Sequence, residues 1–447
     1  MSRPLDVLVL GLNYAPEPTG IAPYTTGMAG FLADAGHRVH VVTGQPHYPQ
    51  WAVADGYRNE RGHSWHGSVE VTRLPHPVPS RPSGRTRIAM EAAFAAQAAT
   101  VGGPSPDVIV AVSPALLTVG AALRRRRPGR TAVGVVVQDL YSRAAVEAGI
   151  LTGREAAATE ALERWLLRGA DGVVAIHESF RRSLVRLGVD AQRVATIRNW
   201  THTGAATGDP EALRRELGWA PGEVIALHAG NMGAKQGLEN VVDAARLAAS
   251  RGLPVRFVLL GAGHQRDHLE RLGRDLPTLQ FLDPLPDGVF ETALRAADVL
   301  VLNERPEIAE MCVPSKLTSY FAAGRPVVAA SSAASAGTAE VLVSGGGVPV
   351  TPGEPGALLD AVLATVADET EALAMGLRGQ LFARDALAER AARDAYVGWV
   401  EGLAGRAPAV EVPRPRRPDA RRYGRRALGL RRVVSRPARP AGLEDAS

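Results

Sequence analysis

Residues 223–237 read Glu-Val-Ile-Ala-Leu-His-Ala-Gly-Asn-Met-Gly-Ala-Lys-Gln-Gly, and this stretch decides the fold class. Its first six residues form a short apolar run of the length expected for a buried strand. Glycines follow at positions 230, 233 and 237, and a helical pattern extends from 238 to 249. A strand that passes through a glycine-containing turn into a helix is the building unit of a doubly wound parallel sheet.

The same alternation of apolar strand and helical pattern extends through most of the chain. Alternating strands and helices predict parallel sheets with right-handed crossovers. We therefore predict an α/β protein with two Rossmann-like domains that face each other across a cleft. The expected strands are 6–10, 39–42, 69–73, 108–112, 132–137, 172–176, 193–197, 223–228, 255–260, 299–302, 326–330 and 347–350.

The order of these elements also predicts the domain boundaries. Residues 1–200 form the N-terminal domain and residues 201–384 the C-terminal one, with a hinge at 198–210. A helix over 385–404, with Tyr396 and Trp399 on its apolar side, is expected to pack back on the N-terminal domain. The arginine-rich, proline-interrupted segment 405–447 is predicted to be a disordered tail.

Length and composition set further limits. A chain of 447 residues suggests two domains, since single cores seldom exceed about 250–300 residues. No apolar run reaches the roughly 20 residues that span a bilayer, and Met1 to Leu10 has the pattern of a strand, without a signal-peptide cleavage site. The single cysteine, Cys312, excludes an internal disulfide framework. We therefore expect a cytoplasmic protein.

Lysine is rare in this chain, which makes its two occurrences informative. Of 51 basic residues only Lys235 and Lys316 are lysines, and both lie in glycine- or proline-containing motifs. A compact ammonium is not interchangeable with a guanidinium where fit matters, so we expect phosphate contacts. Backbone N–H groups at a helix start also attract phosphate. Beside the two lysines, the residues expected to bind the same ligand are Gly230, Asn231, Gly233, Gly261, Gly263 and Ser315, and Pro314 with Ser315 is expected to start the second helix.

Two anion sites on one domain would match the two phosphates of a nucleoside diphosphate. The bland alternatives are a glycine-rich turn without a ligand and a solvent-exposed helix start. With these motifs, the chain resembles the family 4 glycosyltransferases, in particular the bacterial exopolysaccharide and O-antigen group with fucosyl- and N-acetylfucosaminyl-transferases. The resemblance covers about residues 5–400, and the segments that carry it are 12–24, 43–51, 137–141, 198–200, 230–237, 297–298 and 314–326.

The resemblance implies a GT-B fold and retaining transfer from a nucleotide-sugar donor bound mainly by the C-terminal domain. It also implies that no metal or other cofactor is needed, and the sequence shows no convincing metal cluster. One departure concerns the two glutamates of the family, which have seven residues between them, because Met311 and Ser319 stand at these positions. Glu310 is one place off and Glu304 is farther. Glu340 is a substitute near the donor ribose, or else a helix-start charge.

The N-terminal domain would bind the acceptor. Gly20, after the first strand, would bring backbone amides near the diphosphate or sugar, and Asp139 is the candidate catalytic or acceptor-orienting carboxylate. The leaving phosphate is the alternative base. His47, Tyr48 and Trp51 form an aromatic cluster that could stack on a sugar ring of the acceptor or, alternatively, pack as a buried loop. His177 could bind the acceptor or make a structural contact within its loop. The expected acceptor-side residues are Asn13, Tyr24, His47, Tyr48, Trp51 and His177.

Basic residues suggest where the acceptor resides. Arg81, Arg85 and Arg87 precede an apolar helix expected over 88–99, and the run 124–127 is all arginine. Such patterns suit an anionic membrane surface, hence a peripheral location on the inner face of the membrane and a glycan or polyprenyl-linked acceptor. No nucleic-acid partner is expected. The rival hypotheses are a GT-B sugar-nucleotide epimerase and a non-enzymatic binder of anionic polymers.

Overall fold

The computed structural model describes residues 3–81, 83–103, 105–142, 153–201, 204, 206–307 and 315–405. Several residues discussed above lie outside this part of the chain, namely positions 310–312, Pro314, hinge positions 202, 203 and 205, and the tail from 406. Residues up to 408 form one compact unit. No helix among the described residues is long and apolar enough to cross a membrane.

The first sheet has eight strands in the order β3-β4-β2-β1-β5-β6-β7-β8. Every neighbouring pair is parallel except the edge pair β3 and β4. The strands are β1 (Asp6–Leu10), β2 (Arg38–Gly44), β3 (Gly62–His66), β4 (Val69–Leu74), β5 (Val108–Ser113), β6 (Ala132–Val137), β7 (Gly172–Ala175) and β8 (Val194–Thr196).

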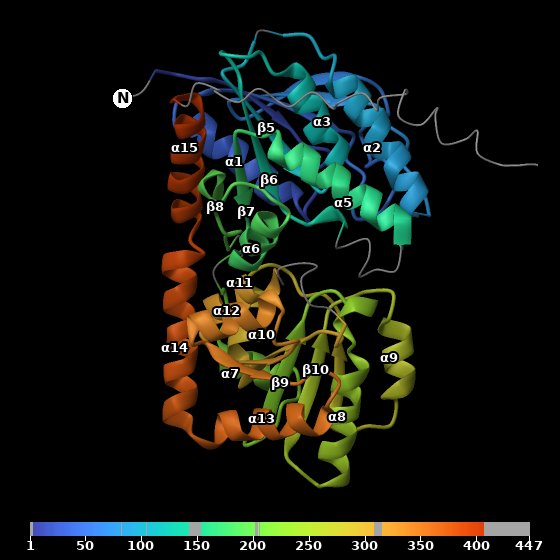
Figure 1. The fold of residues 1–447 in the computed structure, drawn as a ribbon. Helices are drawn as coiled ribbons and strands as arrows, with labels where there is room; N and C mark the ends of the chain where they lie inside the picture. The colour runs from blue at the N-terminus through green and yellow to red at the C-terminus, as the bar shows by residue number, and fades with distance from the viewer. Residues whose placement is uncertain are drawn as a thin grey trace, which may run out of the picture. The chain divides into compact units, whose positions relative to one another are not determined.

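Two apolar cores cover the two faces of this sheet (Figure 1). One core joins the sheet to α2 (Gly84–Ala98), α3 (Leu116–Arg125), α5 (Gly153–Arg168) and α6 (Glu178–Arg186). The other joins it to α1 (Ala22–Asp34) and to α15 (Glu389–Gly405) from the far end of the chain. Both faces are therefore buried, as expected for a parallel sheet.

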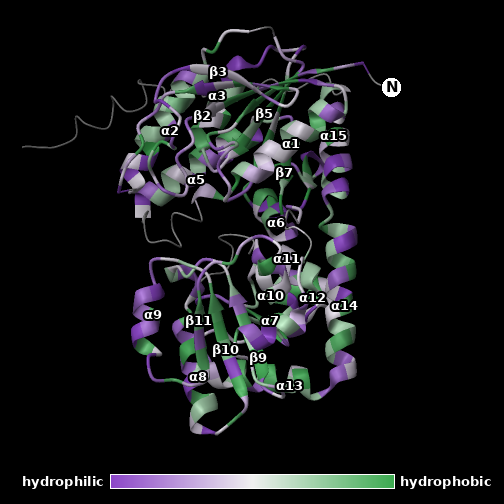
Figure 2. Ribbon diagram, turned by 180° about the vertical axis from the view of Figure 1, so that it is seen from behind, coloured by the Kyte–Doolittle hydropathy of each residue, from purple (hydrophilic) through white to green (hydrophobic). Residues whose placement is uncertain are grey.

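Helix α15 fits against the first sheet because two strands carry glycine under it. A Cβ atom on Gly134 of β6 would lie 2.5 Å from the Trp399 ring, and one on Gly172 of β7 would lie 2.8 Å from Leu403. Tyr396 is fully buried in the same contact. In Figure 2 both α14 and α15 alternate between hydrophobic and hydrophilic colours along their lengths. The helix thus buries one side against strands that left room for its aromatic ring.

The second sheet has six parallel strands in the order β11-β10-β9-β12-β13-β14. The strands are β9 (Val224–Ala229), β10 (Val255–Leu260), β11 (Leu279–Leu282), β12 (Val299–Asn303), β13 (Val327–Ala330) and β14 (Gly347–Val350). Its helices are α7 (Pro210–Glu216), α8 (Glu239–Ser250), α9 (Arg266–Leu272), α10 (Val289–Ala296), α11 (Lys316–Ala323), α12 (Ala336–Ser344), α13 (Pro355–Ala367) and α14 (Glu369–Ala386).

These two sheets confirm the predicted pair of doubly wound Rossmann-like folds. The chain reverses direction across each sheet at one point, between β1 and β5 in the first and between β9 and β12 in the second. In open α/β sheets, ligands bind beyond the carboxyl ends of the strands at such switch points. The loops after β1, β9 and β12 are therefore the places to examine for function.

Three expectations about elements are corrected. Strand β3 was missed and pairs antiparallel with β4; most of its residues are exposed, so it carries no apolar pattern. Edge strand β11 was also missed. The single helix expected from residue 385 is in fact two, since α14 ends at Ala386 and α15 begins at Glu389. The Leu387 carbonyl at this break accepts a hydrogen bond from the Thr201 N–H.

Candidate active site

Lys316 is held at the carboxyl end of β9 by a buried histidine. Its Nζ lies 3.3 Å from Nε2 of His228, whose Nδ1 lies 3.1 Å from the Val301 carbonyl oxygen. Burial and then the charge of Lys316 hold the pKa of His228 well below its usual value, so the ring is neutral. Nδ1–H therefore donates to Val301, and Nε2 accepts from the ammonium of Lys316.

Gly230 leaves space for this ammonium. Its backbone has φ 125°, and a Cβ atom there would lie 3.5 Å from Cε of Lys316. The same loop carries Asn231 and Lys235, both exposed. The loop closes in a single 3₁₀ turn, Ala234–Gln236, before α8 begins at Glu239, so the helix starts slightly later than the sequence predicts.

The end of β12 fixes the backbone around Lys235. The Asn303 amide donates to the carbonyls of Gln236 and Gly237 at 2.7 and 2.9 Å, and Arg305 N–H donates to the Lys235 carbonyl at 3.0 Å. Asn240 supports Asn303 with a further hydrogen bond of 2.8 Å. Lys235 therefore has a backbone held by hydrogen bonds and an exposed side chain, which suits a phosphate contact.

Gly261 and Gly263 have a structural explanation. A Cβ atom on Gly261 would collide with the Gly230 carbonyl, and one on Gly263 would collide with Met232. The two loops are also joined by hydrogen bonds from Gly230 N–H to Leu260 and from Met232 N–H to Ala262. These glycines shape the loop that carries Lys235, and their predicted donor contact stays a prediction.

The start of α11 brings Ser315 beside Lys316. Ser315 is the N-cap residue of this helix, but its side chain makes no capping hydrogen bond. Its carbonyl accepts from the Thr318 hydroxyl at 2.7 Å. One turn later, the Ser319 hydroxyl donates to the Lys316 carbonyl at 2.9 Å, so the residue that replaces the family glutamate bonds within its own helix.

Glu304 is a site residue that the sequence reasoning passed over. It follows β12 directly and is 7% exposed. Burial raises its pKa to about 7, although Lys316, a hydrogen bond from Ser335 and Lys235 each oppose the shift. An acidic residue at the carboxyl end of a buried strand was the available signal.

Asp139 lies after β6, near the C-terminal site. Burial raises the pKa of Asp139 to about 7, and the charge of Lys235 acts in the opposite direction. The two side chains are therefore within electrostatic reach of one another. Next to it, the Gln138 and Asn199 amides exchange hydrogen bonds of 3.2 and 2.9 Å. A carboxyl group that titrates near neutral pH suits proton transfer.

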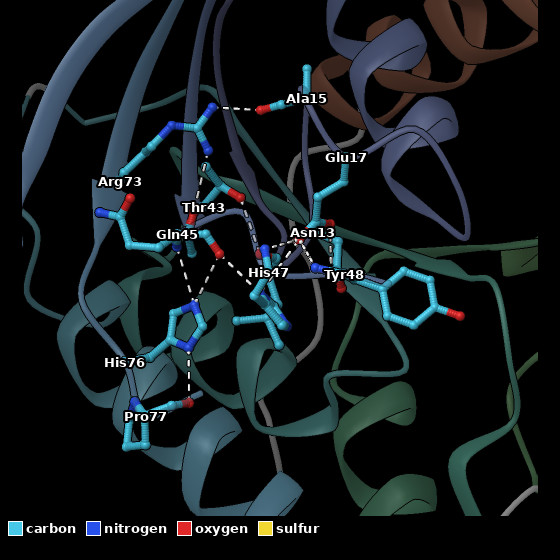
Figure 3. Close-up of polar contacts among 12 residues, drawn as sticks. Asn13, Ala15, Glu17, Thr43, Gln45, His47, Tyr48, Arg73, His76 and Pro77 are labelled. Carbon is cyan, nitrogen blue, oxygen red and sulfur yellow. Dashed lines mark hydrogen bonds and ion pairs between the residues drawn. The ribbon is translucent and has the colours of Figure 1, made fainter. Parts of the chain in front are cut away.

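A buried carboxylate joins two loops of the N-terminal domain (Figure 3). Oε1 of Glu17 accepts from the N–H groups of His47 and Tyr48 at 2.8 and 3.0 Å, and Oε2 accepts from the Asn13 amide at 2.8 Å. Asn13 thus holds the loop, and its predicted contact with the acceptor stays a prediction. Sequence reasoning missed Glu17, although it lies inside the loop that was singled out.

His47 is 2% exposed, with Nδ1 2.9 Å from the Gln45 carbonyl oxygen and its ring 4.9 Å from that of His76. The prediction that His47 binds the acceptor is therefore wrong, and the alternative of buried loop packing is correct. Tyr24 is also corrected, since it is 5% exposed and packs edge-on to Trp200 at 5.1 Å. A tyrosine in the first turn of a helix gave no indication that its ring faces the core.

Tyr48 is the exposed member of the aromatic cluster. Its side chain is 36% exposed, and Figure 3 shows the ring turned away from the buried contacts. A Cβ atom on Gly20, where φ is 71°, would lie 3.2 Å from Cε1 of Tyr48. Trp51 is partly buried and stacks with Arg87 at 4.8 Å. Gly20 and Tyr48 therefore form one exposed surface, whereas the Trp51 ring is already partly covered by Arg87.

Glu340 and His177 meet in a buried hydrogen-bonded contact. His177 Nε2 lies 2.9 Å from Oε1 of Glu340, and Arg198 Nε lies 3.1 Å from the same oxygen. Burial would raise the pKa of Glu340, but His177 and Arg198 outweigh it and hold the pKa below its usual value. These contacts occupy both Glu340 and His177 in this structure. The helix-start alternative for Glu340 is wrong, because Glu340 lies beyond the first turn of α12.

Comparison with known proteins assigns the family. A model described as a glycosyl transferase 4-like domain matches residues 19–200, and one described as glycosyl transferases group 1 matches residues 223–368. The chain is 33% identical over 336 residues to the putative colanic acid biosynthesis glycosyl transferase WcaI of Escherichia coli K12, covering 72% of this chain and 82% of WcaI. This chain belongs to the family 4 glycosyltransferases.

A further relative and two solved structures are also similar to this glycosyltransferase. It is 27% identical over 333 residues to a GDP-mannose-dependent alpha-mannosyltransferase of Mycobacterium tuberculosis, covering 72% of this chain and 78% of that enzyme. Solved structures share its GT-B fold. Sucrose-phosphate synthase from Thermosynechococcus elongatus has a TM-score of 0.69 at 17% identity, covering 89% of this chain and 99% of that one. Anabaena HepE with UDP-glucose has a TM-score of 0.62 at 18% identity, covering 88% and 99%.

The family membership favours a transferase over the two rival hypotheses, since neither an epimerase nor a polymer binder is among the matches described. The geometry brings Lys235, Lys316 and Asp139 into one region, as the sequence predicts. Within the described residues, no group of three His, Cys, Asp or Glu side chains is arranged to hold a metal ion.

Proposed function

We propose that this glycosyltransferase moves a sugar from a nucleoside-diphosphate sugar to a glycan or polyprenyl-linked oligosaccharide in exopolysaccharide or cell-envelope biosynthesis. The observation that carries the proposal is the pair of lysines at the switch point of the second sheet. Lys316 lies beside Gly230, and Lys235 extends from the same loop. The printed names of its relatives agree, since WcaI is assigned to colanic acid biosynthesis and HepE was solved with UDP-glucose.

The proposed chemistry is retaining transfer without a metal. The acceptor hydroxyl would attack on the face from which the diphosphate leaves, and Lys235 and Lys316 would stabilise the developing charge. Asp139 or the leaving phosphate would accept the hydroxyl proton. The exposed surface formed by Gly20 and Tyr48 is the proposed acceptor side, because an aromatic ring can stack on a sugar. Gly20 is thereby assigned to the acceptor, whereas the sequence predicted that it lies near the diphosphate or the transferred sugar.

A peripheral position at an anionic membrane is the proposed location of the acceptor. Arg81, Arg85 and Ile88 are exposed at the start of α2, which supports the idea. The arginine run contributes less than expected. Arg125 donates to the carbonyls of Ala98 and Val101, and Arg126 pairs with Asp171 at 2.6 Å, so only the ends of the run are free to face a membrane.

A thermal-shift screen tests the donor assignment. Purified protein is heated with UDP, GDP, ADP and their common sugars, with EDTA and separately with Mg²⁺. A ligand that binds the folded state raises the melting temperature, and we expect this with one nucleotide in EDTA. The Lys235→Ala and Lys316→Ala variants should lose the shift. No shift with any nucleotide, or an unchanged shift in both variants, would contradict the phosphate assignment.

Product analysis tests the stereochemistry. The anomeric configuration of the transferred sugar, measured by NMR early in the reaction, should match that of the donor. An inverted product, or activity that EDTA abolishes and Mg²⁺ restores, would contradict the retaining, metal-free mechanism.

A further inference from the structure

Glu304 combines burial with an unused hydrogen-bonding atom. It lies at the switch point of the second sheet, where its backbone N–H donates to the Ala330 carbonyl at 2.9 Å. Among the residues that the structure describes, Oε2 of Glu304 is buried and has no hydrogen-bond partner. A buried polar atom without a partner costs roughly 1–3 kcal/mol in a folded protein, so its retention needs a reason.

The neighbours of Glu304 on both sides carry the proposed phosphate contacts. Asn303 and Arg305 hold the backbone around Lys235, as described above. Lys316 and Lys235 both act on the Glu304 carboxyl electrostatically, and Ser335 at the start of α12 forms a hydrogen bond with it. The Glu304 carboxyl, with its unpaired oxygen, is therefore near the two lysines that are proposed to bind the diphosphate.

The charges of this region determine which form of Glu304 can accompany a donor. A diphosphate adds two negative charges beside the carboxyl, and like charges disfavour ionisation. The protonated acid gains instead, because it can donate a hydrogen bond to a phosphate or sugar oxygen. In the free protein, burial already raises the pKa of Glu304 to about 7, so protonation at neutral pH costs little.

We propose that Glu304 is a donor-binding residue that contacts the sugar nucleotide as a neutral acid and takes up a proton from solvent as the donor binds. The inference rests on the proposed function and gives the site a carboxyl group that the missing glutamate pair does not supply. The proton comes from water or buffer, and no covalent bond of the donor changes in this step.

The other charged groups around Glu304 were considered for the same role. Lys316 and Lys235 each lower the pKa of Glu304, and burial together with Lys316 holds the pKa of His228 well below its usual value. One pocket is lined by Glu304 together with Glu239, Asp243, Arg305 and Glu307, but these four side chains are partly or fully exposed. Asp139 is the one rival among these groups, because burial raises its pKa to about 7 as well.

The test measures donor affinity against pH by calorimetry, with UDP-glucose and GDP-mannose as probes. Neither probe has a phosphate group that titrates between pH 6 and pH 8. Glu304 has a pKa of about 7 when free and a higher one in the complex, so affinity should be constant below pH 7 and fall above it. We expect a five- to tenfold loss from pH 6 to pH 8, since one pKa unit corresponds to roughly tenfold.

The Glu304→Gln variant keeps a hydrogen-bond donor but cannot ionise. Its affinity should change less than about twofold over the same range and should exceed that of the natural chain at pH 8. The matched control is Glu307→Gln, which removes an exposed carboxylate from the same segment and should keep the pH dependence. Asp139→Asn should keep it as well. A pH dependence that persists in Glu304→Gln and disappears in Asp139→Asn would overturn the inference.

A second measurement covers the case in which Glu304→Gln does not fold. Calorimetry of the natural chain and of Asp139→Asn in phosphate and in Tris at pH 7.5 gives proton uptake from the difference in heat between buffers. Uptake in both proteins supports Glu304, and its loss in Asp139→Asn contradicts the inference. Binding without proton uptake would refute the inference and leave the proposed function standing. Absence of binding at every pH would contradict both for these donors.

Discussion

The loops at the carboxyl ends of the two sheets differ in how fully their polar side chains are hydrogen-bonded within the protein. Beyond the first sheet, the Glu17 carboxylate accepts three hydrogen bonds from other loop groups, and His47 is buried beside it. Beyond the second sheet, Lys235 is exposed and Glu304 keeps a buried oxygen without a partner in the described chain. The Glu17 carboxylate thus has its hydrogen-bond partners inside the protein, whereas Glu304 has an oxygen that could still bond to a ligand.

This difference shows how to separate residues that build a surface from residues that bind with it. A polar side chain with all its hydrogen bonds inside the protein stabilises the fold, and its removal should change stability first. One with unused capacity near a switch point should change ligand binding first. The predictions below test this distinction, starting with the largest expected effect.

Lys316→Ala should reduce kcat/KM by roughly 30- to 100-fold, because a charge-assisted contact to phosphate contributes about 2–3 kcal/mol. Its melting temperature should fall modestly, because the variant leaves Nε2 of the buried His228 without the Lys316 ammonium. Lys316→Arg should rescue little, since a planar guanidinium does not fit the short approach to His228 and Gly230. Steady-state kinetics with varied donor provide the measurement. Full activity of the arginine variant would show that only charge matters at this position.

Glu17→Ala should destabilise the protein by about 2 kcal/mol, because it leaves the N–H groups of His47 and Tyr48 unpaired. The KM for acceptor should rise several-fold while donor affinity stays unchanged. Glu17→Gln is the matched control, since its amide oxygen can accept the same two N–H groups and its NH₂ can donate to a flipped Asn13. Denaturant unfolding and separate donor and acceptor titrations distinguish the outcomes. Equal changes in donor and acceptor KM would contradict a local role.

Gly20→Ala should cost about 1–2 kcal/mol, because the backbone there has φ 71° and the added methyl group would press on the Tyr48 ring. Acceptor KM should rise along with this loss. Gly36→Ala serves as a control, since Gly36 has φ 90° but no atom within 4 Å of an added Cβ. If both variants lose stability and only Gly20→Ala loses acceptor affinity, the contact with Tyr48 is functional.

Tyr48→Ala should have the smallest effect on stability, below about 0.5 kcal/mol, because its ring is 36% exposed. It should still weaken acceptor binding a few-fold if the ring stacks on a sugar. Tyr57→Ala is a suitable control, as Tyr57 is 37% exposed and its ring is stacked with Arg73 instead. Acceptor titration decides the point, and an unchanged KM would remove Tyr48 from the proposed acceptor surface.

Much of the site could be predicted because its signals are local. The strand, glycine loop and rare lysine coincide within residues 223–237, and Lys316 follows a helix-starting Pro-Ser pair. Each signal can be read without knowing what the segment contacts. Predictions based on residue type alone fared worse. Tyr24 and His47 resembled acceptor contacts, yet one packs on Trp200 and the other on His76.

The residues that were missed owe their roles to distant partners. Glu17 gains its importance from a loop about thirty residues away. Glu340 was singled out from the sequence, but its contacts with His177 and Arg198 in another part of the chain were not. No spacing in the sequence encodes these pairs. The break between α14 and α15 has the same cause, since Thr201 binds the carbonyl at which the first helix ends.

The sequence by itself determined the two doubly wound sheets, the family and the two lysines, because apolar periodicity, glycine turns and rare residue types are properties of short segments. Only the tertiary structure decided which polar groups are satisfied. It buried His47 and Tyr24, placed Glu17 in loop packing and left Oε2 of Glu304 without a hydrogen-bond partner among the described residues. The physical reason is that burial and pairing depend on what surrounds a side chain in space, which the neighbouring residues along the chain do not specify.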